Sequence, residues 1–373
     1  MTVSRKTSLY ENHKKLGAKL IPFSGFLMPL QYSSIIEEHK HVRSMAGIFD
    51  VSHMGEFLIK GDSAKEFLQK VTTNDIDLLK VGKAQYSAIC NENGGIVDDL
   101  LIYNLSDYYM LVVNAANIDK DFKWLQNNLI NDVELENVSD NMGLLAVQGP
   151  ISKEILLPLY PDISSLKYYE TLLPDRDGVI VARTGYSGEL GYEIYCPNDK
   201  IIALWEKLLL LKDLKPVGLG CRDSLRLEMG YSLYGHELDQ STTPIEAGLS
   251  WITKLKTNFI GSDKMNNPIK RKLVPLLLKD RAIPRQGYKI FNDSGDEIGF
   301  ITSGGMSPSL NCGIALAYID LPFAEELECF KIKIRDNFFD IYKTKLPLGM
   351  LIDLSLIHIS EPTRPERIGG GGG

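Results

Sequence analysis

The sequence lacks the long apolar runs that would place it in a membrane. A membrane-spanning helix needs ~18 or more consecutive apolar residues, and no segment reaches that length. The longest candidate, residues 201–211, is interrupted by Glu206 and Lys207. We therefore expect no membrane partner.

Blocks of lysine and arginine with interleaved aromatic residues are also missing, and the net charge is −7. Proteins that bind nucleic acid use such blocks to neutralise phosphates. Nucleic acid is therefore not an expected partner.

Cysteine is scarce. The five cysteines are far apart and include no Cys-x-x-Cys pair, which argues against a disulfide scaffold and against a zinc cluster. The N-terminus has no apolar stretch typical of a signal peptide and no transit peptide. We expect free thiols, no metal, and a cytoplasmic protein of bacterial type.

With 44% hydrophobic and 24% charged residues, the chain has a globular composition, and 373 residues predict two or three domains. Apolar spacing predicts helices at 34–45, 62–71, 119–129, 149–157 and 200–211, and strands at 48–60, 109–114, 178–183 and 191–196. Ser63 to Glu66 has the pattern of a capping box. The third helix is expected to bury Phe122, Leu125 and Leu129.

From residue 272 onward the pattern changes to short strands separated by Gly, Pro and Asn. These strands are predicted at 273–278, 288–291, 298–303, 312–319 and 329–334. Such a series indicates a small all-β unit. Residues 349–373 end in five glycines and read as translated adapter or vector sequence.

The stretch 90–103 combines a polar turn, the pair Gly94-Gly95 and an apolar strand that begins with two carboxylates. A glycine pair between two segments of strand composition predicts a tight hairpin. Side chains alternate along a strand, so Asp98 and Asp99 face opposite sides and one of them can point inward. Two interpretations stay open: a turn Asp that caps backbone amides, or a desolvated catalytic carboxylate.

The stretch 183–193 contains three glycines, with Tyr186 and Glu193 among them. A carboxylate can accept two parallel hydrogen bonds from an amino-pyrimidinone edge, and a nearby aromatic ring suits a flat heterocycle. The alternative is a glycine-rich hairpin with Glu193 in a surface ion pair.

The stretch 218–228 resembles a phosphate loop only superficially, because it lacks the third glycine of a dinucleotide fingerprint and the lysine of a P-loop. Arg222 and Arg226 lie four residues apart beside Asp223, which favours a structural ion-pair network. Ser52-His53 has no nucleophile elbow around it, so His53 is predicted to be a hydrogen-bonded strand residue.

Taken together, these stretches resemble the T-protein family of the glycine cleavage system, the tetrahydrofolate-dependent aminomethyltransferases. The resemblance extends over residues 8–347. It is carried by residues 9–13, 22–30, 47–56, 91–103, 112–117, 183–193, 218–228 and 302–305. After Pro347-Leu348 the chain departs from the family pattern, which continues with a basic or aromatic residue that reaches the pocket.

The resemblance implies an α+β fold with a three-lobed, cloverleaf-like body of mixed antiparallel sheets, a small C-terminal β-barrel, and folate in a central channel. The domains would be a two-lobed folate-binding body at 1–270, a barrel at 271–348, and a tail of non-native appearance at 349–373.

The implied reaction moves the aminomethyl carbon from the lipoyl arm of H-protein to tetrahydrofolate, a co-substrate, and gives 5,10-methylenetetrahydrofolate and ammonia. P- and L-proteins would be indirect partners. The alternative is a folate-binding demethylase or accessory protein of the same fold.

The resemblance also implies roles for individual residues. Asp99 would be the catalytic carboxylate beside the reacting folate nitrogens, Glu193 the acceptor for the pterin edge, and Arg222 a cation in the pocket. The remaining implied cavity-lining residues are Tyr86, Tyr103, Tyr186 and Asn114.

Overall fold

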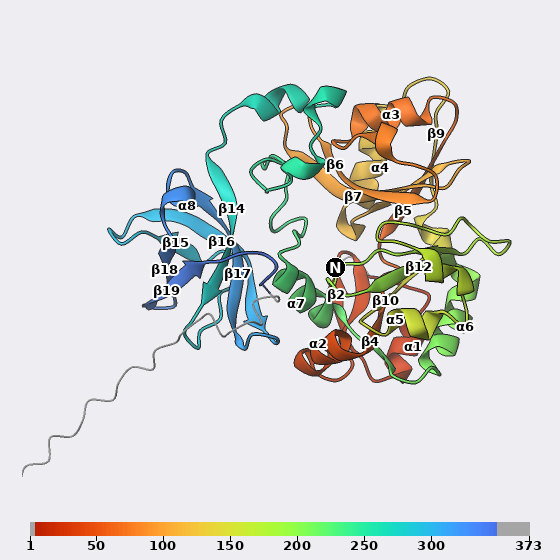
Figure 1. Ribbon diagram of the computed structural model, residues 1–373, viewed down its shortest axis with the longest axis horizontal. Coiled ribbons are helices and arrows are strands. Elements are labelled where there is room, and N and C mark those ends of the chain that lie inside the picture. The colour runs from red at the N-terminus through yellow and green to blue at the C-terminus, as the bar shows by residue number, and fades with distance from the viewer. Residues whose placement is uncertain (1–3, 349–373) are drawn as a thin grey trace, which may run out of the picture.

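The computed structural model describes residues 4–348, and the tail predicted at 349–373 lies outside this range. The described residues form three sheets and one closed barrel (Figure 1). The first sheet has the order β1 (Arg5–Lys6), β3 (Phe26–Gln31), β2 (Lys19–Phe23). Helix α1 (Tyr10–Lys15) precedes β2, and α2 (Ile35–Ser44) follows β3.

Two five-stranded sheets make up most of the body. The second sheet has the order β11 (Ile180–Ala182), β12 (Gly191–Pro197), β10 (Met142–Gln148), β4 (Ala46–Asp50), β13 (Leu214–Pro216). The third has the order β6 (Lys83–Cys90), β7 (Ile96–Asn104), β8 (Tyr109–Val113), β5 (Gly55–Lys60), β9 (Glu134–Asn137). Their inner faces pack together through residues such as Tyr103 and Val112 from one sheet and Ala146 and Tyr195 from the other.

Helices cover the outer faces of these two sheets. On the second sheet, α5 (Ser152–Leu156) and α6 (Asn198–Leu209) pack outside, and α6 buries Ile201, Trp205 and Leu208 at helical spacing. On the third sheet, α3 (Ala64–Val71) and α4 (Ile118–Asn127) do the same. Short 3-10 turns occur at Ile76–Leu78, Ala115–Asn117, Ser139–Asn141, Pro161–Ser165, Ser250–Ile252, Leu255–Thr257 and Ser262–Asn266.

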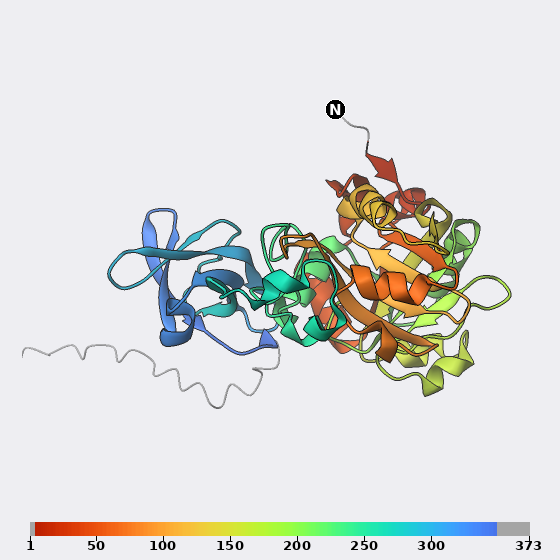
Figure 2. The same ribbon diagram turned by 90° about the horizontal axis from the view of Figure 1, so that it is seen from above.

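The C-terminal unit is a closed six-stranded barrel. Its strands are β14 (Arg271–Leu278), β17 (Cys312–Asp320), β16 (Glu297–Ser307), β15 (Lys289–Phe291), β18 (Cys329–Ile334) and β19 (Asn337–Lys343), with α8 (Phe323–Glu326) between β17 and β18. Both views show it to one side of the stacked sheets (Figures 1 and 2). Helix α7 (Leu219–Met229) lies between them and packs Leu227 against Ile314 and Leu316 of the barrel (Figure 1).

Four local predictions were wrong. The single strand predicted at 48–60 is two strands, β4 and β5, in different sheets, because the chain turns at 51–54 and crosses from one sheet to the other. Ser63 makes no side-chain capping bond to α3. Leu129 lies beyond the end of α4 and is exposed. Strand β19, which closes the barrel, was not predicted.

Candidate functional site

A cavity of about 1160 Å³ lies where the sheets, α7 and the barrel meet. Six of the seven candidate site residues line it: Tyr86, Asp99, Asn114, Tyr186, Glu193 and Arg222. They come from β6, β7, the end of β8, the 184–190 turn, β12 and α7. The fold therefore brings together side chains that are up to 136 residues apart in the sequence, since Tyr86 and Arg222 mark the two ends of that span.

The predicted hairpin places Asp99. Strands β6 and β7 pair with Ala88 opposite Asp99, and Gly94 in the turn has a φ of +85°, which favours glycine. Gly95 has another constraint, because a Cβ there would stand 1.8 Å from the backbone oxygen of Gln240. The turn therefore packs against the 239–242 segment. The Ile96 N–H also donates to the backbone carbonyls of Asp239 and Thr242.

Asp98 and Asp99 point to opposite faces of β7, as the alternation predicts, and they differ in burial. Asp98 is fully buried in the third sheet, whereas Asp99 reaches the cavity. The Tyr86 hydroxyl donates to Asp99 Oδ2 at 2.9 Å, and the Asn114 amide donates to Oδ1 at 2.8 Å. Among residues 4–348, the side-chain partners of Asp99 are these two cavity residues, and its carboxyl group caps no turn.

The environment of Asp99 favours its protonated form. Burial, and then the charge of Asp98, raise the pKa of Asp99 to about 7, although the two hydrogen bonds act in the opposite direction. A carboxyl group with such a pKa can exchange a proton near neutral pH.

Glu193 is buried and forms no ion pair with any residue between 4 and 348, which argues against the surface ion pair. Its Oε2 atom accepts hydrogen bonds from the Thr184 hydroxyl at 2.5 Å and the Tyr195 hydroxyl at 3.5 Å. No group among the described residues donates a hydrogen bond to its Oε1 atom. One oxygen of this carboxylate is therefore open to a ligand.

The two arginines of α7 differ. Arg226 is buried and pairs with Asp223 at 2.8 Å and Glu237 at 3.1 Å, which is the structural network that the sequence favours. Arg222 forms no ion pair within the described residues, and its guanidinium lies 4.7 Å from the centre of the Tyr186 ring. Burial lowers the pKa of Arg222. Arg222 is thus a cavity-lining cation without an ion-pair partner among residues 4–348, whereas Arg226, which also lines the cavity, is held by two carboxylates.

Tyr103 does not line the cavity, which corrects the expectation. It lies on the same face of β7 as Asp99 but four residues further along, where the strand has entered the packing between the two sheets. Its hydroxyl contacts those of Thr184 at 3.2 Å and Tyr195 at 3.0 Å. Tyr103 therefore contacts the two hydroxyl groups that donate to Glu193.

The sequence prediction for His53 was wrong. His53 lies in the turn between β4 and β5, lines the cavity, and its buried Nδ1 atom has no hydrogen-bond partner within the described chain. Burial lowers its pKa to about 4, so the imidazole is neutral. Sequence reasoning also missed Trp251, an exposed residue that stacks on Tyr86 at the cavity wall.

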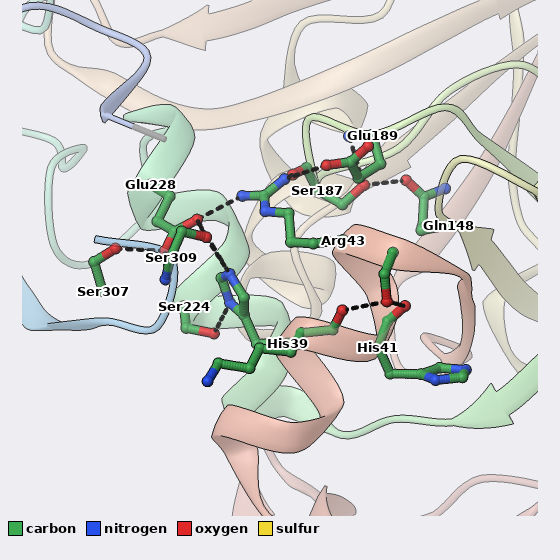
Figure 3. A network of polar contacts seen from close by, with 12 residues as sticks. His39, His41, Arg43, Gln148, Ser187, Glu189, Ser224, Glu228, Ser307 and Ser309 are labelled. Atoms are coloured by element: carbon green, nitrogen blue, oxygen red, sulfur yellow. Dashed lines mark hydrogen bonds and ion pairs between the residues drawn. The ribbon is translucent and has the colours of Figure 1, made fainter. Parts of the chain in front are cut away.

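A separate polar network joins α2, α7 and the barrel (Figure 3). Glu228 of α7 is buried and pairs with Arg43 at 2.9 Å and His39 at 3.1 Å. The hydroxyls of Ser307 and Ser309 donate to it at 2.6 and 2.8 Å. Although burial acts in the opposite direction, these partners lower the pKa of Glu228 to about 2.

The same network reaches the cavity wall. Arg43 also donates to the Ser187 carbonyl at 2.8 Å and pairs with Glu189 at 2.9 Å, and Ser187 donates to Gln148 at 2.7 Å (Figure 3). These contacts fix the turn that carries Tyr186. The barrel and the cavity are therefore linked through one buried carboxylate.

Two family models match the chain. Residues 9–257 match the GCVT N-terminal domain, and residues 271–348 match the glycine cleavage T-protein C-terminal barrel domain. The chain belongs to the glycine cleavage T-protein family. The resemblance drawn from the sequence motifs is thus confirmed.

Relatives of this family agree along nearly the whole chain. The aminomethyltransferase of Halothermothrix orenii is 48% identical over 355 residues, which cover 92% of this chain and 99% of that protein. The aminomethyltransferase of Flavobacterium psychrophilum is 44% identical over 355 residues, with the same coverage of 92% and 99%.

The crystal structure of glycine cleavage system aminomethyltransferase T from Bartonella henselae is similar in fold. Its TM-score is 0.87 at 34% identity, over 92% of this chain and 98% of that chain. The predicted α+β fold with a C-terminal barrel and the predicted enzyme class, an aminomethyltransferase of the glycine cleavage system, are confirmed.

Two features are absent from residues 4–348: a helix able to span a membrane and a metal-binding cluster. None of their helices combines the length and apolar character needed to cross a bilayer. No cluster of three or more His, Cys, Asp and Glu side chains among them is arranged to hold a metal ion.

Proposed function

We propose that the cavity binds tetrahydrofolate next to the aminomethyl-loaded lipoyl arm of H-protein, and that Asp99 is the catalytic residue for transfer of the carbon between them. The observation that carries this proposal is the Asp99 carboxyl group at the cavity wall, held by Tyr86 and Asn114. The volume of about 1160 Å³ exceeds that of most pockets for one small ligand, about 300–1,000 Å³. It can hold parts of two reactants.

The residues of the cavity fit a pterin ring. The open Oε1 of Glu193 can accept from the N–H edge of an amino-pyrimidinone, while Arg222 can donate to its carbonyl. Tyr86 and Tyr186 offer aromatic faces for a flat heterocycle. We assign Glu193 and Arg222 to recognition and the two tyrosines, with Asn114, to the walls.

Tetrahydrofolate would supply the nitrogen that accepts the carbon. Asp99, with a pKa of about 7, is partly ionised at neutral pH. As the carbon forms bonds to two folate nitrogens, its bonds to the lipoyl sulfur and to the amino nitrogen would break, and the two protons that folate loses would leave on the thiol and on ammonia. The Asp99 carboxylate can relay one of these protons, or stabilise a cationic centre by its charge. The remainder of the rate would come from positioning, since two bound reactants behave as one molecule.

Recognition of the lipoyl arm would occur at the cavity mouth, where Trp251 and Tyr168 are exposed. H-protein would be the direct partner, and P- and L-proteins would act only through it. We further propose that residues 1–270 form the folate-binding body and 271–348 an attached barrel domain.

The decisive experiment measures ammonia release from aminomethyl-loaded H-protein with and without tetrahydrofolate. Folate-dependent release, with formation of 5,10-methylenetetrahydrofolate, is expected. Folate binding without any ammonia release would instead indicate a demethylase or accessory protein of the same fold.

A prediction for Glu193 tests recognition separately from chemistry. In Glu193→Ala the pterin edge loses its charged acceptor, which is worth about 2 kcal/mol. The Kd for folate should therefore rise about 30-fold, while kcat at saturation changes little. Equilibrium titration measures this Kd. Glu136→Ala, at an exposed carboxylate of β9 outside the cavity lining, is the control, and an equal rise in its Kd would refute the role of Glu193.

A further inference from the structure

Asp98 occupies a layer directly behind Asp99. It is fully buried, and its oxygens accept three hydrogen bonds from N–H groups. The backbone N–H of Asn114 donates at 3.0 Å, the Asn114 amide at 2.9 Å and the Asn117 amide at 2.6 Å. Hydrogen bonds from three N–H donors favour the ionised form of a carboxyl group.

The Asn114 amide is shared between the two acids. Its nitrogen lies 2.9 Å from Asp98 Oδ1 and 2.8 Å from Asp99 Oδ1, and 3.2 Å from the Asp99 carbonyl. The amide thus bridges the two carboxyl groups. Because its orientation is fixed on the Asp98 side by both its side chain and its backbone N–H, Asp98 determines where the amide meets Asp99.

Asp121 of α4 completes the cluster but differs from Asp98. It is fully buried, and no N–H group among the described residues donates to either of its oxygens. Its neighbour in the cluster is Asp98, whose negative charge acts on it, and neither oxygen of Asp121 has a hydrogen-bond partner within the described chain. A buried carboxyl group that lacks donors and lies beside an ionised carboxylate is stable in its protonated form.

The proton of this pair therefore lies on Asp121. Burial and the charge of Asp98 raise the pKa of Asp121 to about 11, so that it is neutral at physiological pH. Lys120, the nearest cation, is partly exposed and 3.9 Å from Asp121, and it donates to the Val97 carbonyl and the Tyr234 hydroxyl. Asp98 is left as the single negative charge behind Asp99.

We propose that Asp98 is a positioning residue for the transfer reaction: through the Asn114 amide it fixes the Asp99 carboxyl group, and it places a negative charge directly behind that group. This proposal rests on the proposed function of Asp99. Asp98 does not reach the cavity and would act only through its neighbours.

The charge effect on Asp99 comes from a small set of groups. Those that act on it from the surrounding elements are Asp98 on β7, Tyr86 on β6, Lys120 and Asp121 on α4, and Tyr186 on the 184–190 turn. With Asp121 neutral and Lys120 directed elsewhere, Asp98 is the principal nearby anion. Its removal should make Asp99 easier to ionise.

The test compares Asp98→Asn with Asp121→Asn in the pH profile of kcat/KM, measured as ammonia release. Asp98→Asn should shift the acid limb of the profile down by about one pH unit. It should also lower kcat about 10- to 100-fold, since an amide would face the Asn114 donors and displace them. Asp121→Asn should leave the acid limb in place, because an amide resembles the protonated acid.

An unmoved limb in Asp98→Asn, or an equal shift in Asp121→Asn, would overturn the proposal. Thermal melting of both variants checks that they fold. Should Asp98→Asn not fold, Asp98→Glu decides: it keeps the charge but displaces Asn114, so kcat should fall about tenfold or more with the limb unmoved. Wild-type kcat in Asp98→Glu would refute the positioning role. If wild-type protein releases no ammonia, the proposed function fails and the positioning role of Asp98 fails with it, whereas release with an unmoved limb overturns the role of Asp98 alone.

Discussion

Glu228 is buried and Asp99 is partly buried at the cavity wall, yet their surroundings have opposite effects on their pKa values. Glu228 has a guanidinium, an imidazole and two hydroxyls around it, and its pKa is lowered to about 2. Asp99 has a phenol, an amide and a second carboxylate, and its pKa is raised to about 7. The first group stays charged and holds units together, whereas the second can exchange a proton. The signs of the neighbouring charges thus separate the structural carboxylate from the reactive one.

The largest expected effect follows from replacing Asp99 by Asn, which keeps the shape but removes charge and basicity. We expect kcat to fall about 1,000-fold or more, which corresponds to about 4 kcal/mol, while folate binding changes only a few-fold. Ammonia release and folate titration measure the two quantities. Wild-type turnover would show that Asp99 is not a catalytic residue.

The next effect concerns Glu228→Gln, which removes the anion between Arg43 and His39. Breaking a buried pair in this way should lower the free energy of unfolding by about 3 kcal/mol at pH 7, as measured by urea denaturation. Because the folded pKa is below the unfolded value, Glu228 stabilises the protein above pH ~4.5, and this contribution is lost as the pH falls towards 2. Wild type and variant should therefore converge in acid. The partly exposed Glu189→Gln should change stability by less than about 1 kcal/mol.

The third prediction concerns a substitution that should raise the free energy of unfolding. The pKa of Asp99 is higher in the folded than in the unfolded chain, so its contribution to stability is lost as the pH rises from about 4 to about 7. Asp99→Asn should therefore be more stable than wild type at pH 8, by on the order of 2 kcal/mol, and the gain should disappear near pH 4. Denaturation at the two pH values tests this. A variant that is less stable at pH 8 would contradict it.

The smallest effect is expected for Ser309→Ala. Its hydroxyl donates to Glu228 and contacts His39 at 3.1 Å, and loss of these contacts should cost about 1 kcal/mol of unfolding free energy. Ser165→Ala, at an exposed hydroxyl, should cost less than about 0.5 kcal/mol. Equal losses in both variants would mean that the Glu228 network does not depend on its hydroxyl donors.

The sequence predicted the elements whose signal is local. The β6–β7 hairpin, the orientation of Asp98 and Asp99, and five of the six barrel strands follow from turn residues and alternation within about fifteen positions. Six of seven site residues reached the cavity because their motifs could be matched to a family. Tyr103 did not, because alternation gives the face of a strand but not the point at which that face meets another sheet.

The errors share a cause. The composition of 48–60 is that of one strand, and nothing within it marks the crossing between sheets that brings His53 to the cavity. Likewise, Glu228 is one charge on a helix in the sequence. Its partners, 185 and 189 positions upstream and 79 and 81 downstream, become neighbours only through the tertiary fold.

Gly95 has a consequence for any survey of mutations in this chain. A single methyl group there would collide with the main chain of residue 240 and displace the hairpin from the 239–242 segment. Every substitution at this position should therefore abolish activity, although the residue contacts neither reactant. A saturation screen would rank Gly95 with the catalytic positions, and only binding and turnover measured on purified protein could tell them apart.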